Sequence, residues 1–248
     1  MITVSVIIPC FNSSSRIQAC IQSVLDQTYA ISEILIYNDG STDDTEIVIR
    51  ELESNNKLIK AWSGEKTRGA GYARSFLLKK ASSQFIAFLD SDDLWKHNKL
   101  AQQMDIMAKD ENTVIVFSGY DIFKNGRLIG HRSPFPKVNF WSMHISNWIP
   151  MSTAVVRKSA NGSAEMPIMR RRQDYVYWLL ILKNNPQGLV KSAPESLVIY
   201  NRGATSLSSS KLKNLAYNYR VFRDNLHYSP YSSAFFVCLN SITRVFRK

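Results

Sequence analysis

Four short apolar segments recur along roughly the first ninety residues, and segments with helical periodicity separate them. We expect strands at residues 3–8, 33–37, 58–62 and 84–89. The first intervening helix carries its apolar residues on one stripe, formed by Ile17, Ile21, Val24 and Leu25. This alternation predicts an α/β fold with a mostly parallel sheet that helices cover on both faces. In such sheets, ligands bind beyond the carboxyl ends of the strands.

Acidic turns follow two of these strands. Asp90, Asp92 and Asp93 come directly after the fourth strand, and Asp39 follows the second. So much negative charge at the edge of a sheet is costly unless a cation or solvent compensates it. A divalent metal with oxygen ligands would do so, and a solvated turn with an aspartate helix cap is the alternative. The shared position of both turns at strand ends favours a binding cleft.

The composition indicates the size of the domain and the charge of its partners. With 248 residues, of which 45% are hydrophobic, the chain can bury the core of one α/β domain. A net charge of +11 indicates an anionic partner: nucleic acid, an anionic membrane surface or a phosphorylated substrate. The sequence has no zinc-finger spacing, no RNP-type aromatic motif and no unbroken basic run in its first half. We therefore expect no nucleic-acid partner.

From the sequence we expect no targeting signal. No apolar run approaches the ~20 residues of a membrane span. The N-terminal residues read as a first strand rather than a signal peptide. Cys10, Cys20 and Cys238 have neither metal-binding nor redox spacing, and their odd number provides no disulfide framework. We expect a cytoplasmic protein.

The alternation of strands and helices loosens after residue 93. We expect a helix at 96–107, one or two strands within 113–123, a strand at 151–157 and a helix at 172–183. Much of the positive charge falls in this second half, in the run 170–172 and from residue 211 onward.

Five motifs follow one another along the first half of the chain. They are residues 4–12 (VSVIIPCFN), 27–29 (QTY), 38–43 (NDGSTD), 71–75 (GYARS) and 88–95 (FLDSDDLW). Together they resemble the family 2 inverting glycosyltransferases of the bacterial surface-polysaccharide type, which have the GT-A fold, a Rossmann-like sheet flanked by helices. The resemblance is dense over residues 2–107 and continues more weakly to about residue 205. Asn38, Thr67 and Ser75 depart from residues that are frequent in the family.

The resemblance implies a site for a nucleotide-sugar, with a UDP-sugar as the expected donor. The family uses the position of Asp39 to accept a hydrogen bond from uracil N3–H, and a turn-forming role is the alternative. Asp90-Ser91-Asp92 is the DXD-type motif, in which Asp92 binds Mg²⁺ or Mn²⁺ and Asp90 contacts the ribose or a metal-bound water. The metal neutralises the diphosphate and stabilises the departing UDP. Asp93 is expected to cap the following helix.

Further donor contacts are implied at other motifs. The end of the first strand would line the nucleotide base, at Pro9, Cys10 and Phe11. Arg68 and Arg74 would lie near its polar edges and phosphates, and Arg202, in a segment resembling a closing loop, would clamp the diphosphate. Solvated surface charges are the alternative for these arginines.

Asp174 is the candidate general base. Inversion at the anomeric carbon requires one base on the acceptor face. Gln173-Asp174-Tyr175 resembles the family motif Glu-Asp-Tyr or Glu-Asp-Trp, whose aspartate is the base, although Gln173 replaces the usual glutamate. A helix-terminal carboxylate that counters the three preceding arginines is the alternative.

The resemblance also divides the chain into three parts. We expect a nucleotide-sugar-binding half (1–107), an acceptor-binding and catalytic-base half of the same domain (108–210), and a basic amphipathic tail (211–248). Such a tail suits a helix on an anionic membrane surface, or a helix packed on the domain. The expected acceptor is a glycan or a lipid-diphosphate-linked glycan, used by a non-processive enzyme that is peripheral on the inner face of the cell membrane.

Two other classes of function remain open. A nucleotidyltransferase also places acidic residues on an α/β sheet, but residues 9–13 lack the glycine-rich loop usual near its first strand. A non-catalytic basic module that binds nucleic acid or anionic lipid would explain the charge but not the ordered acidic turns.

Overall fold

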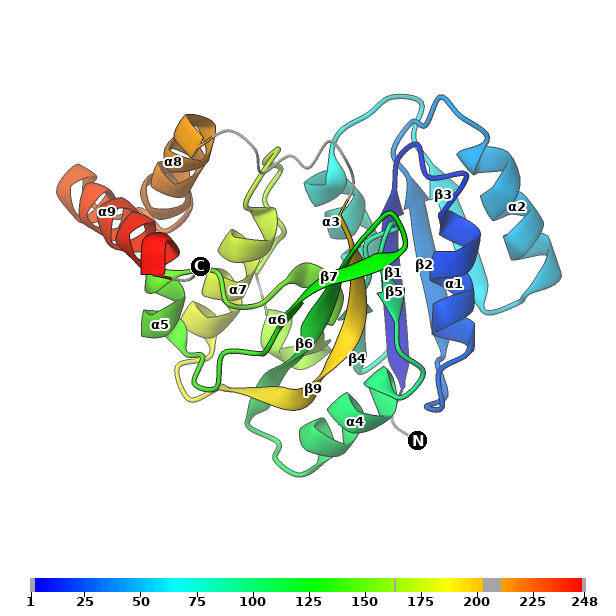
Figure 1. The fold of residues 1–248 in the computed structure, drawn as a ribbon, viewed down its shortest axis with the longest axis horizontal. Coiled ribbons are helices and arrows are strands. Elements are labelled where there is room, and N and C mark those ends of the chain that lie inside the picture. The colour runs from blue at the N-terminus through cyan, green and yellow to red at the C-terminus, as the bar shows by residue number, and fades with distance from the viewer. Residues whose placement is uncertain (1–2, 163, 203–210, 247–248) are drawn as a thin grey trace.

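The structure is a computed structural model that describes residues 3–162, 164–202 and 211–246. Within this part of the chain the strands are β1 (Val4–Cys10), β2 (Glu33–Asn38), β3 (Ile59–Ser63), β4 (Phe85–Phe88), β5 (Leu94–Trp95), β6 (Thr113–Lys124), β7 (Arg127–Arg132), β8 (Val155–Arg157) and β9 (Leu189–Asn201). They form one sheet in the order β3-β2-β1-β4-β8-β6-β9-β5, with β7 paired to β6 (Figure 1).

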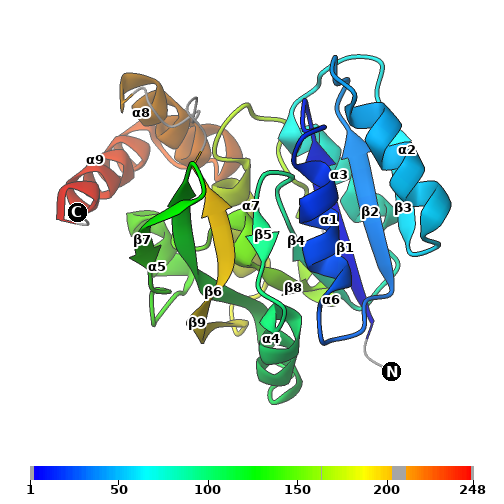
Figure 2. The same cartoon turned by 45° about the vertical axis from the view of Figure 1, so that its right-hand side comes forward.

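The first half of the sheet is parallel and has helices on both faces, as the alternation predicts. The pairs β1–β2, β1–β4 and β2–β3 are all parallel. Helices α1 (Ile17–Leu25) and α2 (Thr45–Asn55) cover one face, and α3 (Ala70–Lys80) covers the other (Figure 2). Successive side chains of a strand point to opposite faces. Accordingly Ile7 lies in the buried cluster that contains Leu77 of α3, while Val6 and Ile8 lie in the one that contains Ile21 of α1.

The second half of the sheet is mixed. β8 is antiparallel to both β4 and β6, β6 and β9 are parallel, and β5 is antiparallel to β9. The helices of this half are α4 (Lys99–Ala108), α5 (Phe140–Ile145), α6 (Lys158–Asn161) and α7 (Gln173–Asn184). The core of α7 is aromatic, since Tyr175, Tyr177 and Trp178 are fully buried.

Two expectations for the second half are corrected. The strand expected at 151–157 is formed only by Val155–Arg157, because Met151–Thr153 make a 3₁₀ turn, η1. The long strand β9 was not expected at all. Its burial does not alternate cleanly and Pro194 interrupts it, so the period-two pattern that identifies a strand is weak.

The C-terminal segment packs on the domain. It consists of α8 (Lys211–Arg220), a π-helical turn η2 (Val221–Asn225) and α9 (Pro230–Phe246), next to α5 in Figure 1. His144 of α5 makes a hydrogen bond of 2.8 Å between its Nε2 and Tyr228 Oη, and burial lowers the pKa of its ring. Asn240 of α9 donates to Tyr175 Oη over 3.1 Å. In the described residues, no helix combines the length and hydropathy that a bilayer crossing requires.

The division into parts 1–107, 108–210 and 211–248 stays a prediction. Its second boundary adjoins residues 203–210, which lie outside the described residues.

Candidate active site

A cavity of about 550 Å³ opens at the carboxyl ends of β1, β2 and β4. The expected donor residues that line it are Pro9, Cys10, Phe11, Asp39, Arg74, Asp90, Ser91 and Asp92. Asp174, at the N-terminus of α7, lines the same cavity. The fold therefore brings the proposed donor residues and the proposed base to one site, although at least 80 residues of chain separate Asp92 from Asp174.

Asp39 is buried and holds the loop that leads into α3. Its Oδ1 accepts the Arg68 backbone N–H over 2.9 Å, and its Oδ2 accepts that of Gly69 over 2.7 Å. Gly40 has a φ of +70°, and a Cβ there would lie 2.7 Å from the Lys66 carbonyl carbon. Glycine is thus required for this close approach. A carboxylate offers about four lone-pair sites, so Asp39 keeps capacity for a ligand.

Asn38 helps to fix the turn that contains Asp39. The Asn38 Oδ1 accepts the backbone N–H of Ser41, three residues on, over 3.2 Å. Its Nδ2 donates to Glu46 of α2 over 2.8 Å.

Arg74 and Asp90 form an ion pair at the floor of the cavity. Arg74 is only 6% exposed. Its Nε is buried and has no hydrogen-bond partner among the described residues. A buried donor without an acceptor costs about 1–3 kcal/mol, which an anionic ligand in the cavity would relieve.

Asp92 is a partly buried carboxylate beside a second one, Asp90. Burial raises the pKa of its carboxyl, and the charge of Asp90 raises it further, while Arg16 and Arg74 oppose the shift. Arg16, just before α1, also lines the cavity. Sequence reasoning missed Arg16 because nothing in its local pattern distinguishes it from a solvated charge.

Asp93 does not cap the following helix, contrary to the expectation. It is buried and accepts hydrogen bonds from the Ser152 hydroxyl over 2.5 Å and from the Asn201 backbone N–H over 3.3 Å. Helix α4 begins only at Lys99. Burial and the charges of Asp90 and Asp92 hold the pKa of the Asp93 carboxyl well above its usual value. Asp93 therefore ties the acidic turn to the end of β9.

Tyr200 of β9 is the first residue of the segment 200–207, which was expected to close over the diphosphate. It lines the cavity, and burial with the charges of three neighbouring aspartates raises the pKa of its phenol to about 12. Sequence reasoning assigned Tyr200 no role of its own, and its position beside the aspartates depends on β9, which was not expected.

Asp174 lies in the first turn of α7 and is partly buried. Its Oδ2 accepts a hydrogen bond of 2.7 Å from Asn147 Nδ2. This contact orients the carboxylate and leaves Oδ1 for a further partner.

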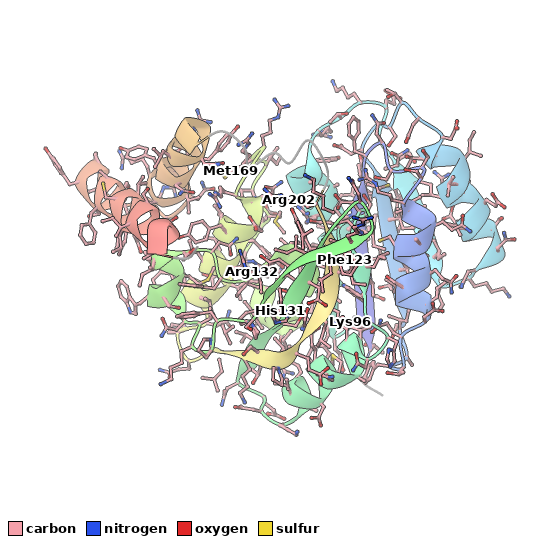
Figure 3. All side chains as sticks on the ribbon, in the orientation of Figure 1. Lys96, Phe123, His131, Arg132, Met169 and Arg202 are labelled. Atoms are coloured by element: carbon pink, nitrogen blue, oxygen red, sulfur yellow. The ribbon has the colours of Figure 1, made fainter. Side chains whose placement is uncertain are left out.

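Two expected residues, Arg68 and Arg202, are not among those that line the cavity. The guanidinium of Arg68 stacks on Tyr72, with its carbon 3.6 Å from the ring centroid. Arg202 is exposed just beyond β9, where its backbone N–H donates to Phe123 O over 2.8 Å (Figure 3). The segment expected to close over the diphosphate is 200–207, and its residues 203–207 lie outside the described residues.

The acidic turn at Asp90–Asp93 offers the oxygen ligands that suit a Mg²⁺ or Mn²⁺ site. Both metals prefer carboxylate oxygens, and Mg²⁺ commonly uses one or two carboxylates with waters and substrate phosphates. The described residues contain no cluster of three or more acidic, histidine or cysteine groups arranged as a complete ligand set. The Asp92 carboxylate is partly buried and lies near the negative charge of Asp90. It therefore fits a metal that is held by only one or two protein carboxylates.

Known proteins share this sequence and architecture. The sequence model of glycosyl transferase family 2 matches residues 5–171. WfgD of Escherichia coli, named as a UDP-Glc:α-D-GlcNAc-diphosphoundecaprenol β-1,3-glucosyltransferase, is 35% identical over 221 residues, which cover 89% of this chain and 85% of WfgD. TuaG of Bacillus subtilis, named as a putative teichuronic acid biosynthesis glycosyltransferase, is 31% identical over 229 residues, 91% of this chain and 90% of TuaG.

The solved structures agree on the fold. S. aureus TarS 1-349 in complex with UDP-GlcNAc superposes with a TM-score of 0.73 at 19% identity, covering 96% of this chain and 71% of TarS 1-349. The expectation of a GT-A fold is thus confirmed. With a family match over most of its length, the chain belongs to glycosyl transferase family 2 and is a glycosyltransferase.

Proposed function

We propose that this protein is a metal-dependent, inverting, non-processive enzyme that transfers one sugar from a UDP-sugar to a hydroxyl of a lipid-diphosphate-linked glycan. One observation carries the proposal. A single cavity joins Asp39, Asp90 and Asp92 at the strand ends to Asp174 at the start of α7. The names of WfgD and TuaG support surface-polysaccharide biosynthesis as the process. The name of WfgD also supports a UDP-sugar as the donor and a diphosphate-linked lipid as the carrier of the acceptor sugar.

The donor half would hold the nucleotide and its diphosphate. Asp39 has lone pairs left to accept the N3–H of uracil, a donor that cytosine lacks. Phe11, which is exposed at the cavity, offers a ring surface for the base. Asp92, with Asp90 beside it, would hold Mg²⁺ or Mn²⁺, which neutralises the diphosphate and the charge on departing UDP. Arg74 supplies a buried N–H for the same anion.

The acceptor half would supply the base. Asp174 accepts from Asn147 through one oxygen, so its other oxygen can remove the proton of an acceptor hydroxyl. A single displacement by that hydroxyl inverts the anomeric carbon, with the UDP leaving toward the acidic turn on the opposite side. Because the aspartate is already oriented, little reorganisation is needed at the moment of attack.

The decisive measurement is acceptor-dependent UDP release. A panel of UDP-sugars is incubated with a GlcNAc-diphospho-lipid, with and without Mn²⁺. We expect UDP release to require both the metal and the acceptor, and the product to have the anomeric configuration opposite to that of the donor by NMR. Retention of configuration would exclude the single displacement, and release of pyrophosphate in place of UDP would indicate nucleotidyl transfer.

We also propose that α9 contacts an anionic membrane surface. One stripe of α9 is apolar and exposed: Tyr231 is 88% exposed, Phe235 62% and Ile242 55%. The opposite side is buried against the domain through Ser233 and Asn240. Two exposed basic residues precede the helix in sequence, Arg220 of α8 and Arg223 of η2. Apolar insertion beside positive charge is the pattern of a helix lying in a membrane interface.

Vesicle co-sedimentation tests this contact. At low salt the protein should bind vesicles that contain phosphatidylglycerol, and binding should weaken as salt rises. Changing Tyr231→Ser together with Phe235→Ser should lower the affinity about tenfold or more, because two aromatic side chains lose their burial in lipid. The control is Leu128→Ser with Ile129→Ser, an exposed apolar pair on β7. Equal binding by both double variants would show that α9 is only a structural helix.

A further inference from the structure

Three consecutive arginines, Arg170, Arg171 and Arg172, line the cavity beside Asp174. Arg170 is exposed, and the other two are partly buried. The donor half described above makes no use of these arginines. Their placement next to the proposed base suggests a second anionic ligand, bound on the acceptor side.

The segment that carries these arginines is held in place by packing. Ala164 and Met166 are buried in the core cluster. A Cβ at position 71 would lie 2.4 Å from the Pro167 carbonyl oxygen, so only glycine lets the segment pack against the start of α3. Arg171 donates from Nη1 to Asn214 Oδ1 of α8 over 3.1 Å. The three arginines therefore lie on a wall of the cavity that the tertiary structure has already built.

Charge distinguishes this wall from the donor half. At the strand ends, Asp39, Asp90 and Asp92 line the cavity together with Arg16 and Arg74, so these five residues carry a formal net charge of −1. A divalent metal there would offset the charges of the donor diphosphate, one on each phosphate. The acceptor wall instead contains three arginines and the carboxylate of Asp174, so its charged lining residues carry a formal net charge of +2.

The side-chain type also fits a phosphate ligand. The planar guanidinium binds phosphate through two parallel N–H bonds, and it has five N–H donors in all. The single bond from Arg171 to Asn214 thus leaves donors for a ligand. The N-terminus of α7 adds partial positive charge at the same place.

We propose that Arg170, Arg171 and Arg172 form the subsite for the acceptor diphosphate, distinct from the donor diphosphate site at Asp92. This inference rests on the proposed function, because it requires a diphosphate-linked acceptor. Two such sites let one cavity hold two diphosphates on opposite sides of the reacting sugar. The net charge left on each side of the cavity then approaches zero when both substrates are bound.

Calorimetry with decyl diphosphate tests the subsite without knowledge of the acceptor sugar. The protein is first saturated with UDP and Mn²⁺, so that the donor site is occupied. We expect the wild type to bind decyl diphosphate, and Arg170→Gln, Arg171→Gln and Arg172→Gln each to weaken binding about tenfold or more, with UDP affinity within about twofold of wild type. Arg171→Lys should restore part of the affinity. The matched control is Arg127→Gln, an exposed arginine on β7.

The outcomes separate this subsite from the proposed function. Normal UDP binding with unchanged decyl diphosphate affinity in all three glutamine variants would overturn the subsite alone. Equal affinity for decyl sulfate, which carries one charge, would also overturn it by showing a general anion surface. A wild type that fails to bind UDP and Mn²⁺ would overturn the proposed function, and the subsite with it.

Discussion

Asparagine in place of Asp92 should abolish sugar transfer, lowering turnover by about 10³-fold or more, and should remove the metal-dependent part of UDP binding. The amide has nearly the shape of the carboxylate but no negative charge. The repulsion between Asp92 and Asp90, which helps to raise the pKa of Asp92, is the interaction that a divalent cation would reverse. The fold should survive, since the substitution removes a destabilising charge. Turnover of a UDP-sugar and calorimetry of UDP with Mn²⁺ measure the two effects.

The control for Asp92 is a carboxylate outside the cavity. Asp105→Asn removes an exposed charge from α4, where Asp105 pairs only at the surface with Lys109. Surface pairs of this kind contribute little to stability, so activity and UDP affinity should match those of the wild type. If Asp92→Asn instead bound UDP and Mn²⁺ with unchanged affinity, the metal would have to lie elsewhere.

Asp174→Asn should lower turnover by ~10²–10⁴-fold, the usual contribution of a general base, while UDP affinity stays close to that of the wild type. The asparagine can still pair with Asn147 but cannot accept a proton from the acceptor hydroxyl. Single-turnover measurements at saturating acceptor would separate this chemical defect from a defect in binding. The effect should fall on kcat rather than on the KM for the donor.

Asn147→Ala provides the matching test of orientation. It removes the donor that holds Asp174, so it should lower turnover less than Asp174→Asn does. A fully active Asp174→Asn enzyme would place the base elsewhere. Two other carboxylates in this half are poor substitutes, because neither lines the cavity. Asp121 is paired with Lys96 and His131, and Glu165 is exposed and paired with Lys79.

The sequence predicted the parallel half of the fold well, because its signals are local. The segments that begin near Val4, Glu33, Ile59 and Phe85 are short and apolar, and the structure has parallel strands at all four. The second half was predicted less completely. β9 pairs with β6 over nearly its whole length, but its own residues lack a clear period. Long-range pairing, rather than local propensity, stabilises it.

The motifs likewise indicated nine of the residues that line the cavity but not the contacts these residues make. Asp39 was expected at a nucleotide base, and the structure adds that it accepts two backbone N–H groups from the next loop. Asp93 resembled a helix cap, yet its partners are Ser152 and Asn201, which are distant in sequence.

The sequence by itself determined the family, the order of strands and helices in the first half, and the carboxylates that end two of those strands. These features depend on side-chain periodicity and on residues next to one another in the chain. Only the tertiary structure decided that Asp174 and Asp92 line one cavity, that Arg16 lines it too and that Arg68 does not. Those placements depend on the order of strands in the sheet and on the packing of α3 and α7 against it. No local pattern encodes them, because each joins segments that become neighbours only when the core is formed.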